Sequence, residues 1–204
     1  MPKSFSASTL IYDINNSRYL NITGRCTLRC QFCPKQQGST QVHQYQLSLD
    51  ATPKAKDIIP LLGQVDTFDE YVFCGYGEPT LNLSTLLEVA TEIKKRHGKV
   101  RVNTDGLGNL FHRRNILPDL SNCVDALSIS LNANTEAAYI QHCQPKLANS
   151  YAALNQFISD APKYIKNVQI SAIDGLSNVN IDACREIAIK NGCQFKHRVL
   201  DIVG

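Results

Sequence analysis

Three cysteines stand close together near the start of the chain, as Cys26-Thr-Leu-Arg-Cys30-Gln-Phe-Cys33. A loop with this spacing is able to wrap around a compact inorganic core. Thiolates select zinc, copper(I) or iron-sulfur clusters. Structural zinc sites and electron-transfer clusters usually take four protein ligands, and a fourth cysteine at metal spacing is missing. In a 4Fe-4S cluster three ligands leave one iron open, so the triplet predicts a catalytic centre.

On spacing alone, two other interpretations of the triplet stay open. One is a zinc or iron-sulfur module with a structural or redox-sensing role, its zinc completed by His43 or another distant ligand. The other is a disulfide, which a reducing compartment disfavours. Disulfide scaffolds belong to short secreted chains, whereas 204 residues are enough for a hydrophobic core. The remaining five cysteines are scattered, at positions 74, 123, 143, 184 and 193.

Two later segments carry residues suited to holding a small molecule. They are Gly-Tyr-Gly-Glu-Pro at 75–79 and Asn-Thr-Asp-Gly at 103–106, and each follows an apolar run. Ligands of parallel α/β proteins bind at the carboxyl ends of strands, where glycines let the backbone approach a ligand closely. Taken alone, the first segment is also typical of a turn into a helix, and Asp105 of an Asx turn.

The run Leu-Ser-Ile-Ser-Leu-Asn at 127–132 alternates apolar and polar residues. Side chains of a strand alternate between its faces, so Ser128, Ser130 and Asn132 share one face. In a barrel this face points inward and presents polar groups to a ligand. The alternative is the solvated face of a half-buried strand.

The elements that must position these residues alternate along the chain. β-rich runs follow one another with helix-period segments between them, which predicts a parallel sheet with crossover helices. About six βα units fit in 204 residues, whereas a closed eight-unit barrel takes about 250. We therefore predict a single α/β domain over 1–204, an incomplete TIM-type barrel in preference to an open doubly wound sheet. The predicted strands are 18–23, 71–74, 99–104, 125–132, 168–173 and 195–200, and the predicted helices 54–63, 82–97, 113–120, 136–142, 151–160 and 181–191.

Composition narrows the class of protein further. Apolar residues make up 43% of the chain and charged residues 19%, as in soluble globular proteins. A net charge of +3, spread along the chain, gives no indication of a nucleic-acid or membrane partner. The first ten residues lack the apolar stretch of a signal peptide. We expect a cytoplasmic protein; its oligomeric state is not predicted.

The Cys-x3-Cys-x2-Cys spacing, directly after the first predicted strand and with an aromatic residue before the last cysteine, resembles the signature of the radical S-adenosylmethionine superfamily. The resemblance implies that Cys26, Cys30 and Cys33 hold a 4Fe-4S cluster. It also implies that the cluster reductively cleaves S-adenosylmethionine to a 5′-deoxyadenosyl radical, which abstracts hydrogen from a substrate. An external electron donor, similar to flavodoxin or ferredoxin, is expected with it.

The resemblance assigns the cofactor-binding residues as well. The 75–79 segment is similar to the family's Gly-Gly-Glu-Pro element, whose role is to hold the cofactor's ammonium group, and Tyr76 replaces its first glycine. The 103–106 segment is similar to an Asn-Thr-Asn-Gly element, with Asp105 replacing an asparagine. By the same resemblance, Val199 stands beside Leu200 as an expected neighbour of the adenine. The implied cofactor contacts are Phe32, Gly75, Tyr76, Gly77, Glu78, Asn103, Thr104, Ser130, Asn132, Ile173 and Leu200.

Within the superfamily the chain most resembles the TatD-associated radical S-adenosylmethionine proteins, a resemblance that supplies no substrate. Two other reactions of the superfamily stay open as alternatives: activation of a glycyl-radical partner and a ring contraction like that of 7-carboxy-7-deazaguanine synthase. Cys143, on a predicted loop at the open mouth of the barrel, is the candidate catalytic thiol, although a free cysteine commonly packs as a small apolar residue.

Overall fold

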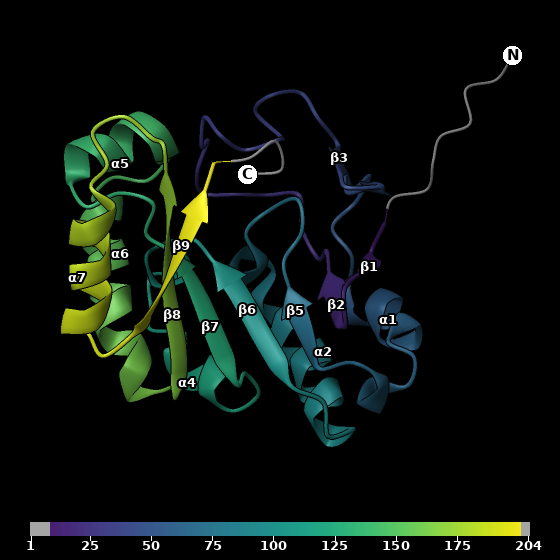
Figure 1. Cartoon of the computed structure of the whole chain (residues 1–204). Helices are drawn as coiled ribbons and strands as arrows, with labels where there is room; N and C mark the ends of the chain where they lie inside the picture. Colours follow the sequence, from purple (N-terminus) through teal and green to yellow (C-terminus); the bar gives the residue numbers. More distant parts are fainter. Residues whose placement is uncertain (1–8, 201–204) are drawn as a thin grey trace, which may run out of the picture.

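The structure, a computed structural model, describes residues 9–200 and is built on one curved sheet. Seven strands lie in the order β1-β2-β5-β6-β7-β8-β9. All neighbouring pairs are parallel except β1, which is antiparallel to β2. Their bounds are β1 Ile11–Ile14, β2 Ser17–Leu20, β5 Glu70–Phe73, β6 Val100–Thr104, β7 Ala126–Ser130, β8 Asn167–Asp174 and β9 Gln194–Val199. The six parallel strands confirm the predicted incomplete barrel (Figure 1).

Helices cover the outer face of this sheet and leave its inner face open (Figure 1). The apolar sides of the helices pack against the strand residues that point to this outer face, and together they form one hydrophobic core. Within residues 9–200, every helix is too short or too polar to cross a bilayer. The helices are α1 Ala55–Ile58, α2 Leu83–Lys95, α3 Gly108–His112, α4 Leu117–Ser121, α5 Glu136–Cys143, α6 Ser150–Asp160 and α7 Ile181–Lys190, with 3-10 turns η1 Ile59–Leu61, η2 Val65–Thr67, η3 Pro79–Asn82 and η4 Ala161–Lys163.

The helix predicted over 113–120 is wrong in its extent, because only the second half of the segment is helical, as α4 from Leu117, and a separate short helix, α3, ends just before it at His112. Arg113 ends α3 with a φ of 53°, in the left-handed region that stops a helix. Pro118 then stands in the first turn of α4, where its missing N–H leaves no hydrogen bond unmade. The helix predicted over 54–63 is likewise shorter, since α1 passes into the 3-10 turn η1 at Pro60.

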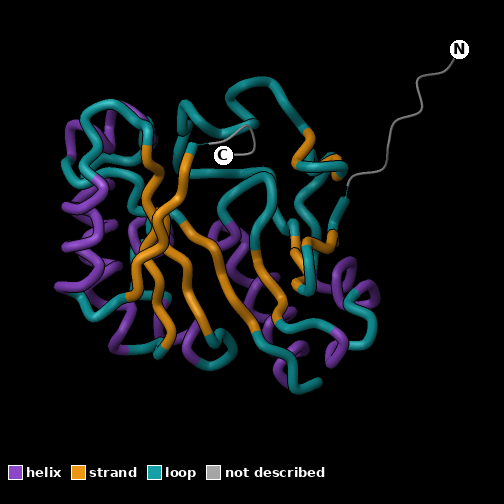
Figure 2. The backbone as a smooth tube through the Cα atoms, viewed as in Figure 1, coloured by secondary structure: helices purple, strands orange, loops and turns teal. Residues whose placement is uncertain are grey.

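Two hairpins had no predicted counterpart. Strand β1 folds back on β2 through a two-residue turn in which Asn15 has a φ of 52°. A small hairpin, β3 Gln41–Val42 with β4 Tyr45–Gln46, follows the cysteine loop and turns at His43, whose φ is also 52°. Figure 2 shows that the β1-β2 hairpin forms one edge of the sheet and that the β3-β4 hairpin lies at the same side of the molecule.

Candidate functional site

The cysteine loop follows β2 and passes over the carboxyl ends of the parallel strands (Figure 1). Its backbone is hydrogen-bonded to the end of α5. The Arg29 N–H donates to the Cys143 carbonyl at 3.0 Å, and the Gln31 N–H donates to the His142 carbonyl at 2.9 Å. These bonds fix the loop over the barrel although it has no regular secondary structure of its own.

The three predicted ligands come together. Cys26, Cys30 and Cys33 line one cavity of about 130 Å³, together with Gly75, Tyr76, Gly77 and Lys146. Among the described residues, no three His, Cys, Asp or Glu side chains converge closely enough to hold a single metal ion. Thiols spread around a cavity fit a cluster, in which each thiolate binds a different iron.

The surroundings of Cys26 and Cys30 raise the pKa of both thiols. Burial raises the pKa of the Cys26 thiol to about 12, and the Asp105 and Glu78 carboxylates add to the rise. For Cys30, a hydrogen bond with the Cys143 thiol is the largest cause of a pKa well above the usual range, followed by burial. Thiolate ligands must lose these protons when they bind metal.

Gly75 and Gly77 let two backbone segments of this chain pack together, and no ligand is needed to explain them. A Cβ at Gly75 would overlap Asn21, and one at Gly77 would overlap the carbonyl oxygens of Thr23 and Arg25. The Glu78 N–H donates to the Arg25 carbonyl at 2.8 Å. The 75–79 segment therefore packs against the backbone that leads into Cys26 and holds it in place.

Tyr76, which stands where the related element has glycine, holds the far end of the cysteine loop. Its N–H donates to Asn21 Oδ1 at 3.0 Å, and its hydroxyl donates to the Ser39 carbonyl at 2.7 Å. The Lys35 ammonium lies 5.1 Å from the centre of its ring. Tyr76 thus links the end of β5 to the residues after Cys33.

Glu78 is buried and engaged on both carboxylate oxygens. Oε1 accepts from the Thr80 N–H at 3.1 Å, the Thr80 hydroxyl at 2.7 Å and the Thr104 hydroxyl at 2.8 Å. Oε2 accepts from the Asp105 N–H at 2.7 Å. The predicted contact with a cofactor ammonium group remains a prediction, and the carboxylate already joins the ends of β5 and β6.

Asp105 is the second buried carboxylate. Its Oδ1 accepts from the Leu107 N–H at 3.0 Å, the geometry of an Asx turn, while its Oδ2 accepts from the Thr27 hydroxyl and lies 4.0 Å from Cys26 Sγ. Burial, and then repulsion from Asp105, raise the pKa of Glu78 to about 8. Burial raises the pKa of Asp105 as well.

A larger cavity, of about 390 Å³, opens beside the cysteine loop onto the inner face of the sheet. It shares Cys33, Gly75 and Tyr76 with the smaller cavity, and Asn103 and Ser130 reach it from β6 and β7. Thr104 faces the other way, toward Glu78.

Asn132 and Cys143 lie together just beyond the end of β7. Asn132 is buried, has a φ of 59°, and its Nδ2 lies 3.9 Å from Cys143 Sγ. Its Oδ1 is buried without a hydrogen-bond partner among the described residues. An unpartnered buried oxygen is costly unless a ligand satisfies it, which fits a polar cofactor group here.

The position expected for Cys143 is wrong in two respects. The residue ends helix α5, not a loop, and its side chain is fully buried instead of facing the open mouth. The predicted helix 136–142 extends by one residue, which turns the thiol toward Cys30. Its proposed part in the substrate step stays a prediction.

The residues expected around the adenine are brought together in part. Phe32 and Leu200 line one groove of about 680 Å³, with Gly175 and Ser177. Ile173 is buried on the same face of β8 as Ser171. The Val199 side chain, in contrast, is 69% exposed, so it packs against little of the chain.

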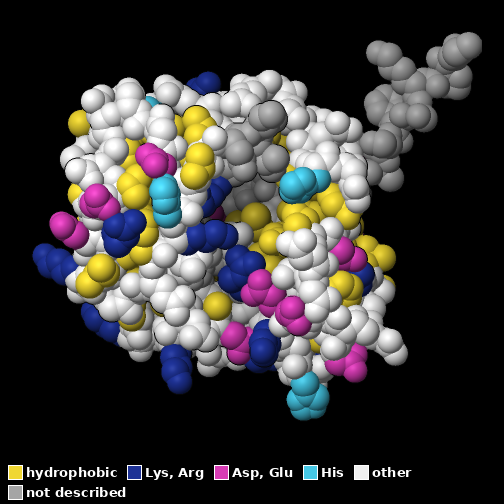
Figure 3. Space-filling model, in the orientation of Figure 1, with side chains coloured by type: hydrophobic (Ala, Val, Ile, Leu, Met, Phe, Trp, Pro, Cys, Tyr) yellow, Lys and Arg dark blue, Asp and Glu magenta, His cyan; other side chains and the backbone are white. Residues whose placement is uncertain are grey.

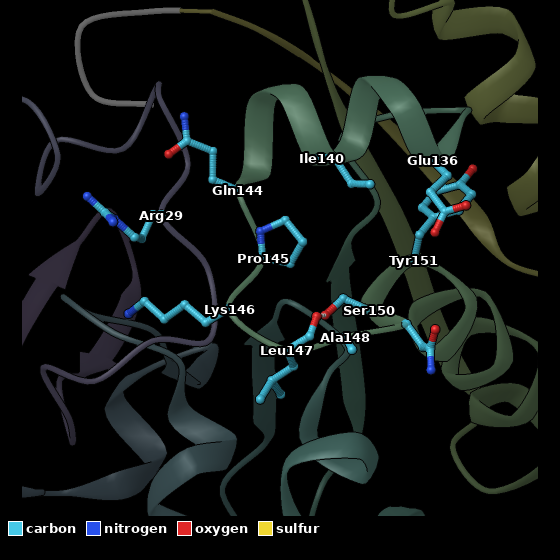
Figure 4. A pocket seen from close by; sticks show the side chains of 11 residues that line it. Arg29, Glu136, Ile140, Gln144, Pro145, Lys146, Leu147, Ala148, Ser150 and Tyr151 are labelled. Carbon is cyan, nitrogen blue, oxygen red and sulfur yellow. Dashed lines mark hydrogen bonds between the residues drawn. The ribbon is translucent and has the colours of Figure 1, made fainter.

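A separate groove of about 650 Å³ lies between α5, α6 and the outer side of the cysteine loop, and none of the three thiols lines it. Figure 4 shows Arg29 and Lys146 at one end of this groove and Glu136 and Tyr151 at the other. The Lys146 ammonium donates to the Cys26 carbonyl at 2.9 Å. Sequence reasoning missed Lys146, because its partner stands 120 positions earlier in the chain.

Comparison with known proteins shows which family the chain is similar to. The sequence profile of the Radical SAM superfamily matches residues 20–188. A curated relative, the tungsten-containing aldehyde ferredoxin oxidoreductase cofactor-modifying protein of Pyrococcus furiosus, is 31% identical over 91 residues. The match covers 43% of this chain and 23% of that protein. The chain therefore matches less than a quarter of the relative's length.

Solved structures show the same fold. SuiB of Streptococcus suis, bound to S-adenosylmethionine, has a TM-score of 0.65 at 15% identity, over 90% of this chain and 40% of SuiB. A radical SAM methyltransferase of Sphaerobacter thermophilus has a TM-score of 0.61 at 13% identity, over 93% and 68%. TYW1 with a lysine-pyruvate adduct has a TM-score of 0.58 at 16% identity, over 89% and 64%.

Proposed function

This chain belongs to the radical SAM superfamily, and we propose that it uses a 4Fe-4S cluster on Cys26, Cys30 and Cys33 to cleave S-adenosylmethionine reductively. The observation that carries the proposal is the single cavity lined by these three thiols at the carboxyl end of β2. The superfamily's cofactors are this cluster and S-adenosylmethionine. When bound, they supply one-electron chemistry that ends in removal of a hydrogen atom from a substrate.

The chain's own residues bind and orient these groups. The three thiols hold the cluster, and the bonds from Arg29 and Gln31 to α5 keep the loop in place. Asn132 Oδ1 offers a buried acceptor to a donor on the cofactor. Ser130 and Asn103 face the cavity beside the thiols, and Phe32 with Leu200 forms an apolar surface suited to adenine.

The test is anaerobic incubation of cluster-loaded protein with dithionite and S-adenosylmethionine, followed by chromatography. We expect 5′-deoxyadenosine and methionine in equal amounts, and none from Cys30→Ala. Cys193→Ala is the matched control, because this thiol stands just before β9, whereas the cysteine loop lies at the carboxyl ends of the strands. Stoichiometric zinc without sulfide, or clustered protein that yields no 5′-deoxyadenosine, would assign the chain to a structural or redox-sensing module.

Enzymes of this superfamily need an external reductant, and we propose a flavodoxin- or ferredoxin-like carrier in the cytoplasm. Arg29 and Lys146 support an approach along the outer groove, because both are cationic and contact the cysteine loop or its anchor (Figure 4). Positive charge favours encounter with an acidic carrier. Arg29→Gln should slow reduction by such a carrier several-fold at low salt and leave reduction by dithionite unchanged. Equal slowing by both reductants would remove the carrier from this face.

A further inference from the structure

Two lysines line the cavity of about 130 Å³ that the three thiols form. Lys35 follows the last cysteine of the triplet by two positions, and Lys146 comes from the loop after α5. Among the described residues, no carboxylate lines this cavity. Neither lysine forms an ion pair within residues 9–200. Both ammonium groups therefore lie beside the thiols without an acidic partner.

Directed contacts hold Lys146 at the cysteine loop although the residue is exposed. Its ammonium donates to the Cys26 carbonyl at 2.9 Å, and its backbone N–H donates to the Thr27 carbonyl, also at 2.9 Å. The residue therefore crosses the start of the loop with hydrogen bonds to two consecutive residues. These bonds, and not burial, keep the ammonium beside Cys26.

Lys35 is held by groups that carry no charge of their own. Its ammonium donates to the Gly24 carbonyl and lies 5.1 Å from the centre of the Tyr76 ring. Because a carbonyl and an aromatic ring are neutral, these contacts fix the position of the ammonium without cancelling its charge. Both lysines also line a cavity of about 420 Å³ along residues 24–27, and no acidic residue of the described chain lines it.

Positive charge at this place matters once the thiols act as ligands. Thiolate ligands are negative, and an added electron makes a cluster more negative still. Asp105 does not offset this charge, because it is acidic and its Oδ2 lies 4.0 Å from Cys26 Sγ. Net charge is one of the properties that set the reduction potential of an iron-sulfur cluster. A cation held nearby favours the reduced state by Coulomb attraction.

We propose that Lys35 and Lys146 are positioning residues that raise the reduction potential of the cluster, by holding two positive charges against its thiolate ligands. The effect should be moderate, because water and salt screen charges there. The larger cavity, which shares Cys33 and Lys35 with the thiol cavity, opens on the hollowed face of the molecule (Figure 3). This inference rests on the proposed function, which places the cluster on the three cysteines.

Anaerobic redox titration of cluster-loaded protein, without S-adenosylmethionine, tests the two lysines. Dithionite supplies the electrons through dye mediators, and electron paramagnetic resonance of the reduced cluster gives the midpoint potential. Lys146→Gln removes the charge and offers a neutral donor to the Cys26 carbonyl, Lys146→Met removes both, and Lys146→Arg keeps both. Lys35→Gln tests the second charge. Lys190→Gln, at the exposed end of α7, is the matched control.

Lys146→Gln, Lys146→Met and Lys35→Gln should each make the equilibrium constant for reduction roughly threefold to tenfold smaller, where tenfold is about 59 mV for one electron. Lys146→Arg and Lys190→Gln should match the wild type. Added salt should shrink the difference between the wild type and Lys146→Gln, because salt screens exposed charges. Iron content should be the same in all of these proteins.

Three results would overturn the inference. An unchanged potential in Lys146→Gln or in Lys35→Gln removes that lysine from the pair. Loss of iron or a changed potential in Lys146→Met but not in Lys146→Gln makes the bond to Cys26 a structural support only. Weaker binding of S-adenosylmethionine by calorimetry, with an unchanged potential, assigns the lysines to the cofactor's carboxylate.

Failure of the radical function gives a different pattern. Clustered protein that yields no 5′-deoxyadenosine, while its potential still depends on Lys35 and Lys146, contradicts the radical function alone. Protein that binds no iron contradicts both proposals. Protein that yields 5′-deoxyadenosine with a potential independent of both lysines contradicts only this inference.

Discussion

Replacing Asp105 with asparagine should stabilise the fold at alkaline pH. In the native structure Asp105 and Glu78 are both buried, and the Asp105 N–H donates to Glu78 Oε2 at 2.7 Å. The Asp105 carboxylate repels that of Glu78, which is the second largest cause of the raised pKa of Glu78. Asparagine keeps the acceptor for the Leu107 N–H and can donate to the Thr27 hydroxyl, so Asp105→Asn removes the charge and spares the local hydrogen bonds.

The magnitude follows from the pKa of Glu78, which rises from 4.5 to about 8 on folding. Because the folded-state value is the higher one, the stability linked to this proton is fully present below pH 4.5 and is lost as the pH rises toward 8. A rise of this size corresponds to about 5 kcal/mol at 1.36 kcal/mol per pH unit. Burial is the largest cause and Asp105 the next, so we assign about 2 kcal/mol to Asp105.

Urea unfolding of reduced, metal-free protein, followed by circular dichroism at pH 5 and pH 8.5, measures this effect. Asp105→Asn should gain about 2 kcal/mol at the higher pH and change little at the lower one. Asp182→Asn is the control, because that carboxylate is 80% exposed beside Arg185 and should change stability by less than about 1 kcal/mol at both pH values. An equal effect of Asp105→Asn at both pH values would refute the coupling.

Other changes separate the cluster ligands from the residues around them. Cys30→Ala should abolish the visible absorbance of reconstituted protein and lower its iron content to background. Gly77→Ala should prevent cluster assembly, because its Cβ would overlap the Thr23 and Arg25 carbonyls; normal iron content would show that the segment shifts without harm. Tyr76→Phe should lower the unfolding free energy by about 1 kcal/mol, the value of its hydroxyl bond to Ser39, as measured by urea unfolding. Cys143→Ala should keep the iron and the cleavage of S-adenosylmethionine but lose turnover of a substrate, whereas unchanged turnover would leave the thiol a packing role.

The parallel sheet was predictable because short β-rich runs alternate along the chain with segments whose apolar residues recur at the spacing of a helix. Helix α2 is the clearest case, since Leu83, Leu86, Ala90 and Ile93 recur at helical spacing and all are buried. Strand β1 was not predictable in the same way. Its four residues gain stability only by pairing with β2, and the turn depends on a left-handed Asn15 that no periodicity reveals.

The site was predictable where one loop carries the chemistry and less so where distant segments meet. Spacing alone placed the three cysteines together, because eight residues cannot spread them far apart. The roles of Asn21 and Lys146 depend on contacts with residues far away in the sequence.

Tyr76 and Asp105, the two positions at which the chain departs from the related sequence elements, both contact the cysteine loop. Asp105, at the end of β6, accepts from the Thr27 hydroxyl and approaches Cys26 Sγ, at the start of the cysteine loop. Tyr76, after β5, donates to the Ser39 carbonyl and supports Lys35, beyond the last cysteine. A glycine in place of Tyr76 would lack both the hydroxyl and the ring, whereas an asparagine in place of Asp105 would keep a hydrogen bond to Thr27 without the charge. Tyr76 and Asp105 therefore hold the loop from its two ends, and the departure at Tyr76 is explained by how this chain positions its thiols.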